Sequence, residues 1–353
     1  MKKRLIILLM IVLSCNKNFK TNTYSISGKV KNVEDKSKVY LKNADSGKIE
    51  DSTLIDSSRF SFSGSVYYPM RYKLVYKNDH QIKEHSLWIE NLPIEISYDF
   101  LNPEKLKILA GKEQEIDANL EKEISFFNPE YIRLTKEGKQ DSIPMLIDKL
   151  TKTIEAFCYK NINSYLSIEL LYSIRTKVNK DTLCKKINEA EKVIHKSNYG
   201  KSLEVFCNSK TPKINDNYID FQVNTLKGNS ISISSLIDEG KPILLVFGGL
   251  KCMEEKGRTL LKNFNEANKN NINTIVFSFT NTQEQWLQDS NYNIGDVTLV
   301  SDLKGDHSPV KIKYNVQVTP TVYVINKFGK ISLISLGFGE NVTEHILTLV
   351  ENK

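Results

Sequence analysis

Hydrophobic and polar residues alternate in short runs over the first part of the chain. Between residues 24 and 100, six runs have the period of two that is typical of β-strands with one buried face. They cover residues 24–30, 38–41, 59–66, 71–76, 86–90 and 94–100. Asn, Asp, Ser, Gly and Pro gather between the runs and favour turns. The pattern predicts an antiparallel, all-β, sandwich-like domain at residues 24–105.

The hydrophobic period changes to that of a helix from about residue 112. Apolar side chains recur every three or four residues through 116–127, 145–158 and 165–174. A further helix is expected to begin at Asp181 and to end near Gly200, because glycine commonly follows a helix. Residues 106–208 are therefore predicted to form a helical region.

Strands and helices mix in the last part of the chain. Residues 243–247 are a continuous apolar run, as in a strand that is covered on both faces of its sheet. Helices are expected over 252–268 and 282–289, strands over 274–279, 318–325 and 331–336, and a capping box at 341–344 before a final helix. These elements predict an α/β domain at residues 209–353, with a central mixed sheet flanked by helices.

The N-terminus has the composition of a targeting segment. Lys2, Lys3 and Arg4 precede nine apolar residues, which are too few for a membrane span of about twenty. Ser14 and Cys15 follow, and Val12-Leu-Ser-Cys15 resembles the lipobox of a bacterial lipoprotein. The resemblance implies a signal peptide at 1–14, acylation of Cys15 and a lipidated tether at 15–23. An ordinary secretory signal that contains a cysteine is the alternative.

Charge and metal-ligand spacing exclude two classes of function. The formal net charge is +7, and removal of the three N-terminal cations lowers it to +4. The remaining charges are interspersed, without the basic cluster that nucleic-acid binding needs, so no nucleic-acid partner is expected. The cysteines after Cys15 are at least 23 residues apart and the histidines are scattered, so no metal or cofactor is expected.

Cysteine positions give expectations for the thiols outside the last domain. Cys158 and Cys184 lie in apolar helical stripes. Buried, inert thiols are therefore expected there, with a structural disulfide as the alternative. Cys207 precedes the α/β domain and is only a weak candidate for a second thiol that approaches Cys252.

Two segments of the α/β domain resemble the thioredoxin superfamily. Residues 241–256 read as a buried strand, a turn and a helix start at Cys252, and residues 314–330 carry Val-Thr-Pro320-Thr-Val. Together they are most similar to thiol-disulfide oxidoreductases of the TlpA/ResA type, within the AhpC/TSA and redoxin-like group. In that family Trp-Cys-x-x-Cys opens a helix opposite a cis-proline. Here Lys251 replaces the tryptophan and Glu255 replaces the second cysteine.

Two further motifs extend the resemblance toward the N-terminus. Ile26-Ser-Gly-Lys-Val and Arg59-Phe-Ser-Phe-Ser-Gly resemble the DUF4369 domain that precedes thioredoxin-like domains in envelope proteins of Bacteroidota. The resemblance implies a lipid-anchored protein of the cell envelope, periplasmic or associated with the outer membrane.

The resemblance assigns roles to five residues of the α/β domain. Cys252 would be the nucleophile, with Lys251 and Glu255 tuning its thiol and with Thr319 and Pro320 shaping a substrate groove. A helix N-terminus lowers a thiol pKa, whereas nearby carboxylates raise it, so the direction of the shift stays open. Trp286 is expected in the core or the groove wall. The glycine pair at 337–339 is too weak a motif for a nucleotide site.

Two functions remain open from the sequence. The first is a membrane-anchored thiol-disulfide oxidoreductase with a degenerate Cys-x-x-Glu site. It would exchange mixed disulfides through Cys252 with protein thiols, protein disulfides or a small thiol. The second is a redox-inactive binding or scaffolding lipoprotein that keeps the thioredoxin fold.

Overall fold

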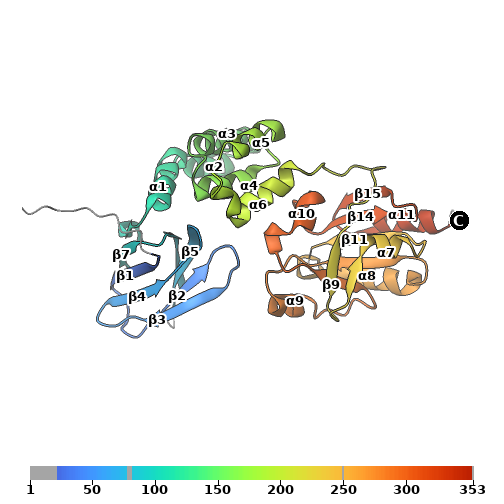
Figure 1. The fold of residues 1–353 in the computed structure, drawn as a ribbon, viewed down its shortest axis with the longest axis horizontal. Helices are drawn as coiled ribbons and strands as arrows, with labels where there is room; N and C mark the ends of the chain where they lie inside the picture. The colour runs from blue at the N-terminus through green and yellow to red at the C-terminus, as the bar shows by residue number, and fades with distance from the viewer. Residues whose placement is uncertain (1–21, 78–81, 249, 352–353) are drawn as a thin grey trace, which may run out of the picture. The chain divides into compact units, whose positions relative to one another are not determined.

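The computed structural model describes residues 22–77, 82–248 and 250–351. The predicted signal peptide, the lipidation of Cys15 and most of the tether lie outside these residues, as does the side chain of Cys252. The chain divides into two compact units, one up to Ala118 and the other from Asn119 onward. Figure 1 shows the strands and helices of both units.

The first unit contains two four-stranded sheets. One has the order β4-β1-β7-β8 and the other β3-β2-β5-β6. The strands are β1 (Tyr24–Lys31), β2 (Lys38–Asn43), β3 (Ile49–Leu54), β4 (Arg59–Gly64), β5 (Met70–Lys77), β6 (Ile82–Ile89), β7 (Pro93–Asp99) and β8 (Lys107–Leu109), with a 3-10 helix η1 (Pro103–Lys105) before β8. The prediction of a purely antiparallel domain is wrong at one pair, because β1 and β7 run parallel.

The alternating runs explain most of this unit. In β1 every second side chain is buried, and the inward residues of β1, β4, β5 and β7 contribute to one hydrophobic core. β3 was not predicted, because its sequence Ile-Glu-Asp-Ser-Thr-Leu has no buried position. Antiparallel pairing with the preceding strand β2 forms this strand, and pairing through backbone groups leaves no periodic pattern in the side chains.

Helix α1 (Lys112–Ile124) begins in the first unit and contacts β6 there through Trp88. The buried indole Nε1 of Trp88 donates to Oδ2 of Asp117 at 3.1 Å, and its backbone N–H donates to Gln114 at 3.0 Å. The Arg71 guanidinium lies 5.0 Å from the centre of the Trp88 ring and 3.7 Å from the Asp117 carboxylate. These bonds attach the start of the helix to the sheet.

The second unit begins with a helical region. It contains α2 (Phe127–Lys136), η2 (Gln140–Ser142), α3 (Ile143–Lys160), α4 (Tyr165–Ile174), α5 (Lys180–Asn188), η3 (Ile194–Lys196) and α6 (Asn198–Cys207). The prediction of one helix from Asp181 to about Gly200 is wrong. The helix ends at Asn188, and α6 starts at Asn198 because the Ser197 side chain accepts a hydrogen bond from the backbone N–H of Gly200.

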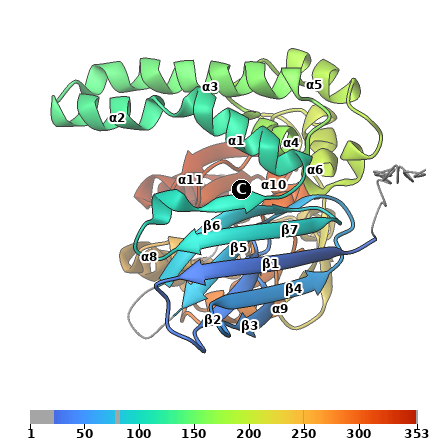
Figure 2. The same ribbon diagram turned by 90° about the vertical axis from the view of Figure 1, so that its left-hand side faces the viewer.

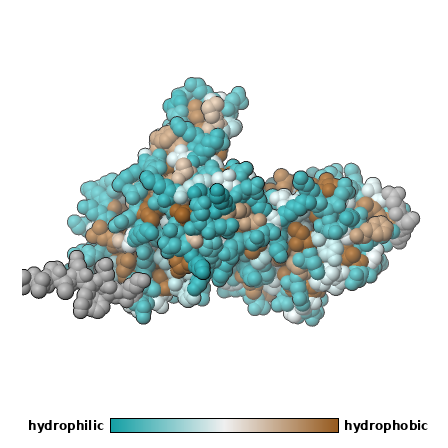
Figure 3. All heavy atoms as spheres, turned by 45° about the horizontal axis from the view of Figure 1, so that its top comes forward, coloured by the Kyte–Doolittle hydropathy of each residue, from teal (hydrophilic) through white to brown (hydrophobic). Residues whose placement is uncertain are grey.

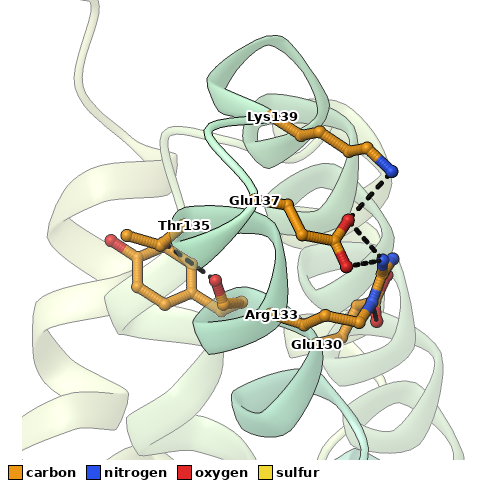
Figure 4. Close-up of polar contacts among 6 residues, drawn as sticks. Glu130, Arg133, Thr135, Glu137 and Lys139 are labelled. Carbon is orange, nitrogen blue, oxygen red and sulfur yellow. Dashed lines mark hydrogen bonds and ion pairs between the residues drawn. The ribbon is translucent and has the colours of Figure 1, made fainter.

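Helix α2 ends in a network of exposed ion pairs (Figure 4). The Arg133 guanidinium lies 2.6 Å from Glu130 and 2.8 Å from Glu137, and Lys139 lies 2.9 Å from Glu137. A hydrogen bond from Arg133 lowers the pKa of the Glu130 carboxyl below its usual range. Solvent screens such pairs, so the network orients side chains more than it stabilises the fold.

A disulfide joins α5 to the end of α6. Cys184 and Cys207 are bonded, with their Cα atoms 5.6 Å apart. The expectation of a buried free thiol at Cys184 is therefore wrong, because the packing of α5 beside α6 brings together two cysteines that are 23 residues apart. Cys207 is likewise no candidate partner for Cys252. Cys158 is a buried free thiol, as expected.

The helical region packs on the α/β domain within the second unit. Tyr172 in α4 donates its hydroxyl hydrogen to the backbone carbonyl of Asp306, and Ser202 in α6 lies 2.9 Å from Nδ1 of His307. The rings of Tyr199 and His307 are 4.6 Å apart. This interface is polar and aromatic.

A seven-stranded mixed sheet, of order β10-β9-β13-β12-β11-β14-β15, forms the α/β domain. Its strands are β9 (Gln222–Thr225), β10 (Ser230–Ser232), β11 (Ile243–Phe247), β12 (Asn273–Phe277), β13 (Thr298–Ser301), β14 (Thr321–Ile325) and β15 (Ile331–Leu336). Its helices are α7 (Ile233–Ile237), η4 (Leu250–Cys252), α8 (Glu255–Asn268), α9 (Gln283–Asp289), η5 (Gly305–His307), α10 (Pro309–Lys313) and α11 (Glu340–Glu351). β11 is parallel to β12 and antiparallel to β14.

Helices cover both faces of this sheet, as predicted. Side chains of α7 and α10 join the hydrophobic core on one face, and those of α8 and α11 join the core on the other. β11 is buried at every position, as its continuous apolar run predicts. The strand β13 and the helix α10 were not predicted, and α11 begins at Glu340, so the expected capping box at 341–344 lies inside the helix.

The face of the protein drawn in Figure 3 is mostly hydrophilic, with hydrophobic residues in small groups. Among the described residues, no helix combines the length and the apolar character that a membrane span requires.

Candidate functional site

The turn that carries Cys252 follows the central strand β11. Gly248 leaves the strand with φ of +115°, and the 3-10 helix Leu250–Cys252 follows. The Met253 side chain is buried, and α8 begins at Glu255 after Glu254. The expectation that Cys252 opens the helix is wrong, since the cysteine lies three residues before it.

Arg258 holds this turn in place from the first part of α8. Its Nη1 atom donates to the backbone carbonyl of Leu250 at 3.1 Å and also to that of Met253. The guanidinium lies 4.6 Å from the centre of the Tyr292 ring. Both acceptors lie within eight residues of Arg258, so these bonds fix the turn to the first part of α8 by contacts within one short segment.

The proline loop lies against the end of the same strand. The peptide bond between Thr319 and Pro320 is cis, as the resemblance implies. Thr319 is exposed and lies directly over Gly248, where a Cβ atom would lie only 2.6 Å from the Thr319 Cβ. The Pro320 carbonyl accepts a hydrogen bond of 2.8 Å from the backbone N–H of Gly337. The cysteine turn, the proline loop and the end of β15 are thus neighbours.

A groove of about 500 Å³ runs between these three segments. It is lined by Met253 and Gly257 from the cysteine turn and α8, by Pro320, and by the turn from Gly337 to Glu340. Phe338 supplies an aromatic side chain to this lining. The glycine pair at 337–339 was assigned no functional role from its motif, although a Gly-Phe-Gly turn directly after the last strand was a usable signal.

The structure brings only some of the predicted site residues together. Pro320 is half-buried and lines the groove. Thr319, the residue before it, packs against Gly248. Lys251 and Glu255 are both exposed and are not lining residues of this groove. Glu255 is the first residue of α8.

Two other expectations concern Trp286 and metal binding. Trp286 is a buried residue of α9, and its Nε1 atom has no hydrogen-bond partner among the described residues. It is therefore a core residue and not part of the groove lining. Within the described part of the chain, no group of three His, Cys, Asp or Glu side chains is arranged to hold a metal ion.

Comparison with known proteins gives a match to a family model and similarities to solved structures. Residues 24–116 match the family model of the domain of unknown function DUF4369. A search of curated proteins finds no match. Solved structures with a similar fold include the thioredoxin domain of a thiol-disulfide oxidoreductase from Bacteroides vulgatus. It has 20% sequence identity and a TM-score of 0.36, and the match covers 40% of this chain and 99% of that domain.

A thiol-disulfide oxidoreductase from Bacteroides fragilis is a second such structure. It has 23% identity and a TM-score of 0.34, and the match covers 38% of this chain and 99% of the other. The chain thus carries a DUF4369 domain at residues 24–116 and is similar, over about 40% of its length, to thiol-disulfide oxidoreductases of thioredoxin fold.

Proposed function

We propose that the protein is a membrane-anchored thioredoxin-like protein of the cell envelope that exchanges mixed disulfides through the single cysteine Cys252. The observation that carries the proposal is the meeting of the cysteine turn and the cis-Pro320 loop at one groove. An extended substrate segment in this groove would lie beside the residue that follows Cys252. Thr319 and Pro320 would shape the binding surface.

The exchange needs two thiolate attacks. The Cys252 thiolate attacks one sulfur of a substrate disulfide, forms a mixed disulfide and releases the other sulfur as a thiolate. An external thiolate then attacks the mixed disulfide, forms a new disulfide with the substrate sulfur and returns Cys252 to its thiolate. Over the cycle, the external thiol replaces one half of the substrate disulfide, that half leaves as a thiolate, and the protein is neither oxidised nor reduced.

An external thiol is required because the described residues supply no internal one. Glu255 occupies the position of a resolving cysteine, and a carboxylate cannot attack a disulfide in this way. Cys207 is bonded to Cys184, and Cys158 is buried. Lys251 and Glu255 would act as tuning groups that change the thiolate population through their opposite charges. The partner would be a protein thiol or disulfide, or a small thiol.

The envelope location rests on two features. The lipobox-like segment would be cleaved before Cys15, and acylation of Cys15 would hold the protein on a membrane. The disulfide between Cys184 and Cys207 is in keeping with an oxidising compartment, because such bonds are rare where cellular thiols stay reduced.

The test is to trap the mixed disulfide on the full chain with bis(2-hydroxyethyl) disulfide and to locate the adduct by peptide mass spectrometry. We expect the adduct at Cys252 and its loss in Cys252→Ser, with exchange restarted by added reduced glutathione. Cys158 is the internal control for unspecific modification. Absence of an adduct at Cys252 in a folded protein would refute the proposed exchange.

One observation favours a second candidate function, that of a redox-inactive binding lipoprotein. Since α8 begins at Glu255, Cys252 is not in the first turn of the helix, where unpaired N–H groups most strongly stabilise a thiolate. The rate of iodoacetamide alkylation at Cys252 against pH separates the two functions. An inflection well below pH 8.5 would support exchange, and one at or above about pH 8.5 would support binding alone.

A further inference from the structure

The DUF4369 domain has a hollow on its surface that none of the functions above uses. It has a volume of about 850 Å³ and lies over the outward face of β1, β4, β7 and β8. Figure 2 shows β7, β1 and β4 side by side in this sheet. The end of β3 and its connection to β4 contribute one side, including Leu54 and Asp56.

Three cations stand in one row across the floor of this hollow. Arg59 in β4 is the register partner of Lys29 in β1, Lys29 is level with Ser97 in β7, and Ser97 is level with Lys107 in β8. All four residues are exposed and line the hollow. With strands about 4.8 Å apart, the row from Arg59 to Lys107 is about 14 Å long.

The three cations of this row make no close polar contact through their side chains with another described residue, although Asp56 and Glu95 line the same hollow. No ion pair and no side-chain hydrogen bond links Lys29, Arg59 or Lys107 to another described residue. Asp56 is near the row, and its carboxylate is paired with Lys36 at 3.0 Å. Two like charges directly opposite each other destabilise a strand pair, so the facing Lys29 and Arg59 are costly unless an anion binds between them.

The next row along the strands has a different chemistry. It consists of Ser61, Ser27, Glu95 and Leu109, level with one another across β4, β1, β7 and β8. Ser27, Ser61 and Glu95 present hydroxyl and carboxylate groups that bind hydroxyls well and repel a second anion. The exposed Leu109 and Leu54 supply apolar contacts within the same lining.

We infer that this hollow is a binding site for an acidic oligosaccharide. A carboxylate or phosphate of the sugar would lie on the row of Arg59, Lys29 and Lys107, and its hydroxyl groups would bond to Ser27, Ser61 and Glu95. A concave site accommodates a soluble ligand better than it accommodates the flat surface of a lipid bilayer. No exposed aromatic side chain is among the described lining residues, so the stacking that single-stranded nucleic acids require is lacking.

The test is calorimetric titration of the full chain with trigalacturonic acid, its neutral methyl ester and inorganic tripolyphosphate. We expect the acid to bind and the ester to bind far more weakly, with affinity falling as salt rises. Lys29→Gln and Arg59→Gln should each weaken binding by roughly tenfold, the effect of losing one charge-assisted hydrogen bond. The control is Lys31→Gln, an exposed lysine on the same strand outside the hollow, which should leave the affinity unchanged.

A second measurement needs no variant. Acetylation of lysines in the wild-type chain, with trigalacturonic acid present, should spare Lys29 and Lys107 and leave Lys31 reactive. Failure of the acid to bind, equal protection of all three lysines, or binding of tripolyphosphate without any binding of the acid would each overturn the proposal. In the last case the row would recognise charge alone.

Discussion

Thr319 lies on Gly248 so closely that a Cβ atom added to the glycine would lie 2.6 Å from the Thr319 Cβ. The contact joins the residue before the cis-proline to the residue that follows β11 and begins the cysteine turn. The two loops of the candidate site therefore depend on the absence of a side chain at one position.

Gly248→Ala should destabilise the second unit for two reasons. The backbone at Gly248 has φ of +115°, which costs a non-glycine residue roughly 1–3 kcal/mol, and the new methyl group would collide with Thr319. Gly240→Ala is the matched control, because Gly240 also has positive φ but has open space around its Cβ position. Urea unfolding should show a larger loss for Gly248→Ala. Equal losses would mean that the Thr319 loop moves aside.

The disulfide between Cys184 and Cys207 should stabilise the helical region. A closed loop of this size typically contributes about 3 kcal/mol, largely by restricting the unfolded chain. We expect dithiothreitol to lower the urea midpoint of the wild-type protein. The double variant Cys184→Ala and Cys207→Ala should show a low midpoint that dithiothreitol no longer changes. A wild-type midpoint insensitive to reduction would show that α5 and α6 are held by packing alone.

Cys158 should make the free energy of unfolding fall as the pH rises into the alkaline range. Burial raises the pKa of its thiol to about 12, whereas an unfolded thiol ionises near 9. The folded state therefore holds the proton more tightly. The stabilisation is complete below pH 9 and is lost as the pH rises toward 12. Between pH 8 and pH 10 the free energy of unfolding should fall by about 1 kcal/mol from this group.

Comparison with Cys158→Ala isolates this contribution, because buried tyrosines such as Tyr323 also have raised pKa values and titrate in both proteins. The variant should be less stable at pH 8 and should lose less stability toward pH 10. Parallel pH profiles for the two proteins would rule out the thiol as the source.

Asp117 should stabilise the first unit by accepting the hydrogen bond of the Trp88 indole. Asp117→Ala leaves the buried Nε1 donor of Trp88 without its acceptor, which costs about 1–3 kcal/mol. Asp117→Asn keeps an oxygen acceptor and should cost less. Thermal unfolding followed by tryptophan fluorescence measures both. If the asparagine variant is as unstable as the alanine variant, the ion pair with Arg71 carries the effect instead.

Elements were predicted correctly where their own residues carry a clear pattern of hydrophobic and polar positions. The apolar run 243–247 marked the central strand, and alternation marked β1 and β7. The start of α8 was misplaced because hydrophobic periodicity carries no sign of bonds from a side chain to the backbone, such as those from Arg258 to the carbonyls of the preceding turn. The disulfide partner of Cys184 was likewise beyond a local pattern, since only the packing of two helices brings Cys207 to it.

The same limit applies to the candidate site. Pro320 and Thr319 were assigned from a motif, and the structure brings Pro320 to the groove. Phe338 and the turn that carries it come from the far end of β15, about 85 residues after the cysteine. No spacing rule connects the two segments. The hydrogen bond from Gly337 to the Pro320 carbonyl places them together.

Glu255→Cys tests whether the scaffold around Cys252 still supports dithiol chemistry. Glu255 is the first residue of α8, so a thiolate there would be stabilised by the unpaired N–H groups of the helix start. We expect the variant to form a disulfide with Cys252 and to catalyse the reduction of insulin by dithiothreitol faster than the wild-type protein. Glu255→Ser, which removes the carboxylate without adding a thiol, should show no gain. If the Cys variant also shows none, the turn from Leu250 no longer presents Cys252 to the helix, and the binding function becomes the better assignment.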